Sequence, residues 1–163
     1  MAGLVRKGLS DMKIVLAEDS STMRKILVRL LNSLGYDDIR EAEDGAQALK
    51  LVLDESFDLL ITDWDMPNMS GLELINVLRT NPDTVDIPIL VSTSRSGQDE
   101  VIEAMSTGAN DFISKPFNDV ELKAKIESVL KSVNVLIAED STSMMGVLKK
   151  MLEGMGYSNV YEA

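Results

Sequence analysis

The amino-acid sequence predicts an α/β fold: a doubly wound, five-stranded parallel sheet with helices on both faces. Two observations predict it. Five short apolar segments alternate with five longer segments whose apolar residues recur at helical spacing. The short segments are apolar at consecutive positions, which is typical of strands buried on both faces. We therefore expect the flavodoxin-like (β/α)5 arrangement, in which ligands bind beyond the carboxyl ends of the strands.

The predicted strands cover residues 13–17, 39–42, 57–63, 88–92 and 111–114. The predicted helices lie between and after them, at 21–34, 45–55, 71–79, 98–107 and 119–131. Ser20 or Ser21 can cap the first helix, because serine side chains accept hydrogen bonds from free backbone amides there. Gly35 and Gly108 end the first and fourth helices.

Composition excludes several functional classes. A net charge of −11 argues against a nucleic-acid partner for this portion, because such proteins neutralise phosphates with clustered basic residues. The chain has no cysteine and no histidine, so it has no disulfide, no thiolate or histidine metal site and no Ser-His-Asp triad. No signal-peptide core or membrane span is evident. We expect a cytoplasmic protein that binds no membrane.

Polar residues stand at the carboxyl ends of four predicted strands. Glu18 and Asp19 follow the first, Asp63 ends the third, Thr93 follows the fourth and Lys115 follows the fifth. Neighbouring strands are about 4.8 Å apart, so these side chains can converge on one cleft. Carboxylates about 5 Å apart would repel by roughly 3 kcal/mol per pair at an effective dielectric constant of 20. A hard divalent cation, Mg²⁺ or alternatively Mn²⁺, would relieve that repulsion.

Such a cluster suits phosphoryl transfer. A carboxylate beside Mg²⁺ can attack a phosphoryl group, because the metal neutralises charge on the equatorial oxygens. Lys115 and the Thr93 hydroxyl could each bind another phosphoryl oxygen.

Five motifs in order and spacing resemble the signatures of the response-regulator receiver (CheY-like) family. They are LAEDS at 16–20, ITDWDMPNMSGLEL at 61–74, PILVSTS at 88–94, GANDF at 108–112 and KPF at 115–117. The resemblance covers residues 12–131 and is nearest to the single-domain chemotaxis type. It implies a phosphoacceptor signalling domain of a two-component system, which catalyses only its own phosphorylation and dephosphorylation.

The resemblance also implies roles for individual residues. Asp63 would accept the phosphoryl group from a sensor histidine kinase or a phosphotransfer protein. The metal would be held by Asp19 and Asp63 directly, by the backbone carbonyl of Asp65, and by Glu18 through water. Lys115 would bind the phosphoryl group.

Further implied roles concern switching and phosphoryl lifetime. Thr93 and Phe112 would form the switch pair that remodels the face of helix four, strand five and helix five toward an output domain or target protein. The bond before Pro116 is expected to be cis. Asp65 and Arg95 occupy positions that adjust phosphoryl lifetime, and an acidic Asp65 could either direct or repel a water.

The end of the chain repeats its beginning. Residues 13–42 and 134–163 align without gaps at an offset of 121, with eleven of thirty positions identical. Glu139 and Asp140 therefore resemble a vestigial second acid pocket. We divide the chain into an N-terminal leader (1–11), a receiver domain (12–132) and the truncated start of a second receiver domain (133–163), a strand, a helix and a strand.

A β-α-β fragment of this size cannot bury its own core. Its helix has an apolar face, made by Met144, Val147, Leu148, Met151 and Leu152. We expect the first domain or another chain to cover that face, the latter as a homodimer.

Two alternatives stay open. Asp63-Trp64-Asp65 spells the DxD motif of haloacid-dehalogenase phosphohydrolases, but it ends the third strand rather than the first, and Pro67 stands where that family has Thr or Val. The second alternative is a receiver that serves only as a binding module and is not phosphorylated (a passive module). Turnover of a generic phosphomonoester would support the phosphohydrolase. Trp64, expected to be semi-exposed beside the site, would test the passive module by its emission on titration with Mg²⁺ and beryllofluoride.

Overall fold

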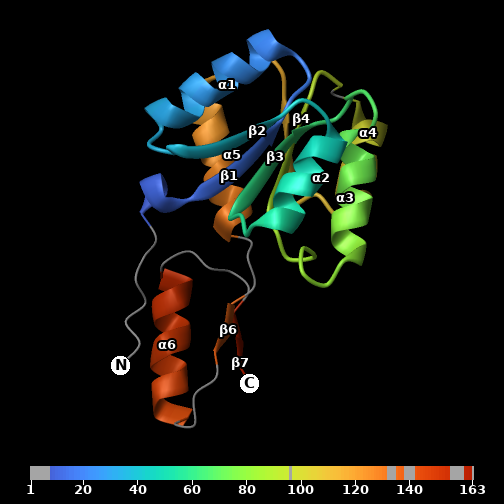
Figure 1. Ribbon diagram of the computed structural model, residues 1–163. Coiled ribbons are helices and arrows are strands. Elements are labelled where there is room, and N and C mark those ends of the chain that lie inside the picture. Colours follow the sequence, from blue (N-terminus) through green and yellow to red (C-terminus); the bar gives the residue numbers. More distant parts are fainter. Residues whose placement is uncertain (1–7, 96, 132–134, 138–141, 155–159, 163) are drawn as a thin grey trace.

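Five parallel strands form the central sheet of the structure, a computed structural model that describes residues 8–95, 97–131, 135–137, 142–154 and 160–162 (Figure 1). The strands are β1 (Lys13–Ala17), β2 (Asp38–Ala42), β3 (Leu59–Asp63), β4 (Ile89–Thr93) and β5 (Asp111–Ser114). Their order in the sheet is β2-β1-β3-β4-β5, and every pair is parallel. The doubly wound, flavodoxin-like sheet predicted from the sequence is thus confirmed.

Helices cover both faces of the sheet. They are α1 (Ser21–Ser33), α2 (Gly45–Asp54), α3 (Gly71–Thr80), α4 (Gln98–Thr107) and α5 (Asp119–Lys131), and a 3-10 turn, η1 (Leu9–Asp11), precedes β1. The helices α1 and α5 lie on one face of the sheet, and α2, α3 and α4 lie on the other (Figure 1). Side chains of each group form an apolar cluster with the sheet. Because both faces are packed, the central strands are buried along all or nearly all of their length, as their continuous apolar sequences indicated.

The starts of β2, β3 and β4 and the end of β4 differ from the sequence prediction by one or two residues. β3 begins at Leu59 rather than at residue 57, because the Asp58 carboxylate accepts a hydrogen bond from the backbone N–H of Lys13 at 2.7 Å and ties the two strand starts together. β4 begins at Ile89, since Pro88 has no N–H to donate; its carbonyl still accepts from the Leu60 N–H at 2.9 Å.

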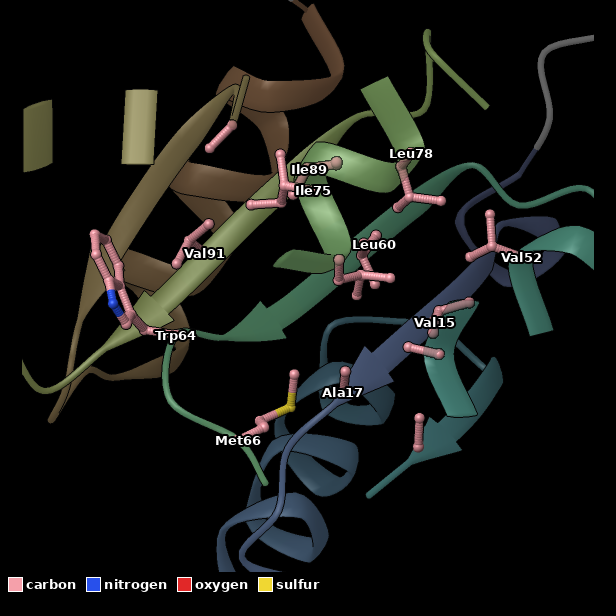
Figure 2. Close-up of a cluster of buried hydrophobic side chains, with 14 of the residues drawn as sticks. Val15, Ala17, Val52, Leu60, Trp64, Met66, Ile75, Leu78, Ile89 and Val91 are labelled. Atoms are coloured by element: carbon pink, nitrogen blue, oxygen red, sulfur yellow. The ribbon is translucent and has the colours of Figure 1, made fainter. Parts of the chain in front are cut away.

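Trp64 is buried, and the expectation that it would be semi-exposed is wrong. Its residue is 4% exposed, and its ring lies at the end of the cluster shared by β3, β4, α2 and α3 (Figure 2). The backbone N–H of Trp64 donates to the carbonyl of Ser92 at 3.0 Å, which continues the β3–β4 ladder by one residue. Asp63 is turned toward the cleft, and the next side chain therefore points into the core.

The C-terminal segment forms a second, two-stranded parallel sheet. It consists of β6 (Val135–Ile137), α6 (Thr142–Gly154) and β7 (Val160–Glu162). Val135 pairs with Val160, and the residues 121 positions earlier, Ile14 and Ile39, pair with each other in β1 and β2. The bounds of α6 likewise fall 121 residues after those of α1.

The residues assigned to a second acid pocket, Glu139 and Asp140, lie outside the described part of the chain. On α6, Met144, Val147 and Met151 are each about half exposed, at 50%, 53% and 58%. Within the described residues, no helix combines the length and the apolar content that crossing a bilayer requires.

Candidate functional site

Three carboxylates meet where β1 and β3 end. One oxygen each of Glu18, Asp19 and Asp63 lies within 4.8 Å of the other two. The sheet order explains this, because β1 and β3 are neighbours and Ala17 pairs with Thr62, one residue before each strand's acidic end. Glu18 is buried, Asp63 is partly buried and Asp19 is exposed, so the cluster opens from the protein interior toward solvent.

The Lys115 ammonium group contacts two of these carboxylates, Glu18 and Asp63. Its Nζ lies 2.7 Å from Glu18 Oε2 and 3.0 Å from Asp63 Oδ2. Burial would lower the pKa of Lys115, but hydrogen bonds to Glu18 and Asp63 outweigh that effect and raise it. The ammonium group is therefore charged at neutral pH and partly compensates the three carboxylates.

Glu18 has the least favourable environment of the three acids. Burial raises its pKa, and the neighbouring Asp63 charge acts in the same direction, while the Lys115 hydrogen bond opposes them. The second oxygen of Glu18 accepts from the Ser20 N–H at 3.2 Å. Asp63 Oδ1 accepts from the Trp64 N–H at 2.7 Å, so both Asp63 oxygens have a donor.

The donor set fits a hard divalent cation. All three converging groups are carboxylates, and Asp19 is open to solvent, which leaves room for the water ligands that Mg²⁺ retains. The cluster carries three acidic groups against one ammonium group, so a cation would reduce the remaining repulsion. The structure brings together Glu18, Asp19, Asp63 and Lys115, as the sequence predicted.

Thr93, Arg95 and Asp65 form a second group beside the cluster. The Thr93 hydroxyl oxygen accepts from the backbone N–H of Arg95 at 2.9 Å, and Thr93 is only 1% exposed. The guanidinium of Arg95 contacts both oxygens of Asp65, at 3.0 Å each. Arg95 therefore links Thr93 at the end of β4 to the loop that follows Asp63.

Phe112 lies on the edge strand β5, apart from the acid cluster. The Lys125 ammonium sits 5.0 Å from the centre of its ring and 2.8 Å from the Asp111 carboxylate. A groove of about 490 Å³ runs along β5 and α5 here, lined by Phe112, Phe117 and Lys125 among others. The Lys115–Pro116 peptide bond is cis.

Sequence reasoning missed three residues that support the site from outside. Arg24 is 9% exposed, and its guanidinium donates to the backbone carbonyl of Glu18 at 2.6 Å and contacts two glutamates. Asn68 and Asp44 join two loops by a side-chain hydrogen bond of 2.7 Å. The position of Asp44, just before a helix that begins with Gly-Ala, was a readable cap signal. Nothing in the sequence around Arg24 indicated that its side chain would reach the backbone carbonyl of Glu18.

Comparisons with known proteins agree with this geometry. The family model described as "Response regulator receiver domain" matches residues 14–127. The chain is 41% identical to the chemotaxis protein CheY of Pseudomonas aeruginosa over 123 residues, covering 76% of this chain and 99% of that protein. It is 46% identical to a CheY homolog of Campylobacter jejuni over 120 residues, covering 73% and 92%.

A solved structure gives the same result. The chemotaxis protein CheY4 of Vibrio cholerae is 30% identical to this chain, with a TM-score of 0.68, and the match covers 72% of this chain and 98% of that one.

Proposed function

The chain belongs to the CheY-like response-regulator receiver family of two-component systems, and we propose that its receiver accepts a phosphoryl group on Asp63 in a Mg²⁺-dependent reaction. Receiver domains are signalling domains rather than classical enzymes, which sets the phosphohydrolase alternative aside. They interact with histidine kinases or phosphotransfer proteins and with output targets, and they bind Mg²⁺ at an acidic cluster.

The observation that carries the proposal is the contact of Lys115 with Asp63 inside a cluster of three carboxylates. An oxygen of Asp63 would attack phosphorus. The new O–P bond forms as the P–N bond of a donor phosphohistidine breaks, and the leaving imidazole nitrogen keeps the electron pair. Lys115, already within 3.0 Å of Asp63, would then bind an oxygen of the transferred group.

The proposed metal ligands are Asp19, Asp63 and the Asp65 backbone carbonyl, with Glu18 acting through water. When bound, Mg²⁺ would supply positive charge against the phosphoryl oxygens. Glu18 is 2% exposed and already bonded to Lys115, so it suits an indirect role better than a direct one.

Thr93 and Phe112 are the proposed switch. The Thr93 hydroxyl accepts from the Arg95 N–H here, and its own O–H can donate to an oxygen of the phosphoryl group. Movement of Thr93 would free space for the Phe112 ring, which packs against the same apolar cluster as Trp64 and Val91. The altered face of α4, β5 and α5, which includes the groove between β5 and α5, would then contact the output domain or target protein.

Asp65 and Arg95 are proposed to set the phosphoryl lifetime. Because Arg95 holds both Asp65 oxygens, that carboxylate is not free to direct a water at the phosphoryl group. We expect Arg95→Gln to shorten the lifetime measured by loss of radiolabel. Asp65→Asn/Arg95→Gln should lose the acceleration, because no carboxylate remains to direct the water. A lifetime in Arg95→Gln equal to that of the wild type would contradict this role.

Labelling with acetyl phosphate tests the central proposal. Asp63→Asn should abolish radiolabel incorporation, since the amide is not a nucleophile. The control Asp83→Asn, in the exposed loop before β4, should label like the wild type in Mg²⁺ and not at all in EDTA. Persistent labelling of Asp63→Asn would refute Asp63 as the acceptor, and a wild type unresponsive to Mg²⁺ and beryllofluoride would favour the passive module.

We also propose that residues 133–163 are the opening of a second receiver domain. The identical offset of 121 in sequence, helix bounds and strand register supports this. The half-exposed apolar residues of α6 support association of two copies through this segment. Light scattering across a concentration series should show a dimer that Val147→Glu disrupts and Val77→Glu, on α3, does not. A strict monomer would rule the dimer out.

A further inference from the structure

The loop between β3 and α3, which contains Asp65, is tied to the loop that precedes α2. Asn68 Nδ2 donates to Asp44 Oδ2 at 2.7 Å. The other oxygen of Asp44 accepts from the Gln47 N–H at 2.8 Å and thereby caps α2. Next to this contact, the Gly45 N–H donates to the carbonyl of Met69 at 3.0 Å. One carboxylate therefore joins the first turn of α2 to the loop that follows Asp63.

The backbone here restricts which residues can stand at these positions. Asn68 has φ = 62°, in the left-handed region, which asparagine adopts more readily than most residues other than glycine. The two backbones also approach so closely that a Cβ on Gly45 would lie 2.6 Å from the Met69 carbonyl oxygen. The Asp44–Asn68 hydrogen bond and the Gly45–Met69 bond together hold the two loops in this close contact.

We propose that Asp44 and Asn68 are positioning residues for the metal: together they hold the Asp65 backbone carbonyl where Mg²⁺ is bound. The inference rests on the function proposed above. Before Asp65, the loop is fixed by the Trp64 N–H on Ser92; after it, the loop is held at Asn68 and by the Gly45–Met69 backbone bond. Mg²⁺ requires near-ideal octahedral geometry, so a ligand carried on a loop that has lost one of its attachments would bind it more weakly.

The Asp44–Asn68 hydrogen bond, called the anchor below, is present at neutral pH. The Gln47 N–H, first, and the Asn68 amide hold the pKa of Asp44 below its usual range. Its carboxylate therefore stays ionised and able to accept both hydrogen bonds at neutral pH. Asp44 is 7% exposed, so solvent competes little for those bonds.

Two single substitutions remove the anchor while sparing other features. Asp44→Ser keeps a capping hydroxyl for α2 but is too short to reach Asn68. Asn68→Gly keeps the left-handed backbone but loses the amide. Each should raise the Mg²⁺ dissociation constant, read from Trp64 emission, roughly three- to tenfold. The double variant Asp44→Ser/Asn68→Gly should bind no more weakly than the weaker single variant, because both remove the same contact.

Two further variants serve as controls. Asp44→Asn should bind Mg²⁺ like the wild type, since its oxygen can cap α2 and its amide can donate to the Asn68 oxygen once the Asn68 amide has flipped. Asn81→Gly removes the side-chain oxygen that accepts from the Asp83 N–H at 3.0 Å in another exposed loop. It should leave Mg²⁺ binding unchanged.

Thermal unfolding separates positioning from simple stabilisation. A structural role lowers the Tm equally with and without Mg²⁺, whereas a positioning role also shrinks the increase in Tm that Mg²⁺ produces. Dissociation constants within twofold of the wild type in both single variants, or weakened binding in Asp44→Asn, would overturn the positioning role of Asp44 and Asn68. Neither outcome would affect the proposed function. A wild type that binds no Mg²⁺ would overturn the proposed function as well.

Discussion

At Glu18, stability and function oppose each other within one side chain. The carboxyl group is 2% exposed, and burial raises its pKa, so ionising it in the folded protein is unfavourable. Its negative charge nevertheless contributes to the cluster that attracts the metal. A residue that is retained despite such a penalty is typical of a functional site.

Glu18→Gln should therefore raise the Tm of the metal-free protein. The folded state keeps the Glu18 proton to a higher pH than the unfolded state, so wild-type stability falls, relative to the variant, as the pH rises from about 4.5 through the raised pKa. Thermal unfolding in EDTA across a pH series would measure this difference. A variant less stable than the wild type at neutral pH would show that the Lys115 contact outweighs burial.

Gly71 matters because its Cα lies against the main chain of the phosphoacceptor. A Cβ there would be 2.1 Å from the Asp63 carbonyl oxygen, so Gly71→Ala must displace backbone. We expect a loss of about 3 kcal/mol in unfolding free energy, together with reduced labelling of Asp63. Gly146→Ala, in α6, is the matched control: nothing lies within 4 Å of its Cβ position. It should increase helical content slightly and leave labelling unchanged.

Among the helices, α1 is fixed to the site by a charged residue rather than by apolar packing alone. Arg24 lies in its first turn and bonds the Glu18 carbonyl, Glu41 and Glu43. The position 121 residues later is Met145, which is 7% exposed. The two β-α-β units thus place different chemistry at the same buried position.

Arg24→Met tests that difference. Removing the guanidinium leaves the Glu18 carbonyl without this donor, at an expected cost of about 2 kcal/mol in urea unfolding. Arg40→Met removes an arginine that is itself more exposed, with a side chain 44% exposed against 11% for Arg24, and it should cost less than about 1 kcal/mol. Equal losses in the two variants would contradict a special role for Arg24.

For the molecule as a whole, the receiver sheet is complete without the C-terminal repeat. All five of its strands and every residue of the proposed site lie within residues 12–132. We expect deletion of residues 133–163 to leave both Mg²⁺ affinity and the labelling of Asp63 unchanged. Impaired labelling of the shortened protein would mean that the repeat contributes to the site.

Most of the fold could be predicted from the sequence because the five α/β repeats each carry their own periodicity. Helix bounds agree to within a residue, as for α4 and α5, and the strand errors at β3 and β4 come from Asp58 and Pro88, whose effects involve other strands. Trp64 was misjudged because it lies beside the site, which opens to solvent, whereas alternation along the strand turns its side chain inward.

The sequence alone determined which residues end the strands, and hence that Glu18, Asp19, Asp63 and Lys115 would share one edge of the sheet. Local periodicity encodes the face on which a side chain lies. It does not encode the partner, which can be far away in the chain: Lys115 meets Glu18 across 97 residues, and Asn68 meets Asp44 across 24. Only the closed tertiary structure decided those contacts, because they depend on how every intervening element packs.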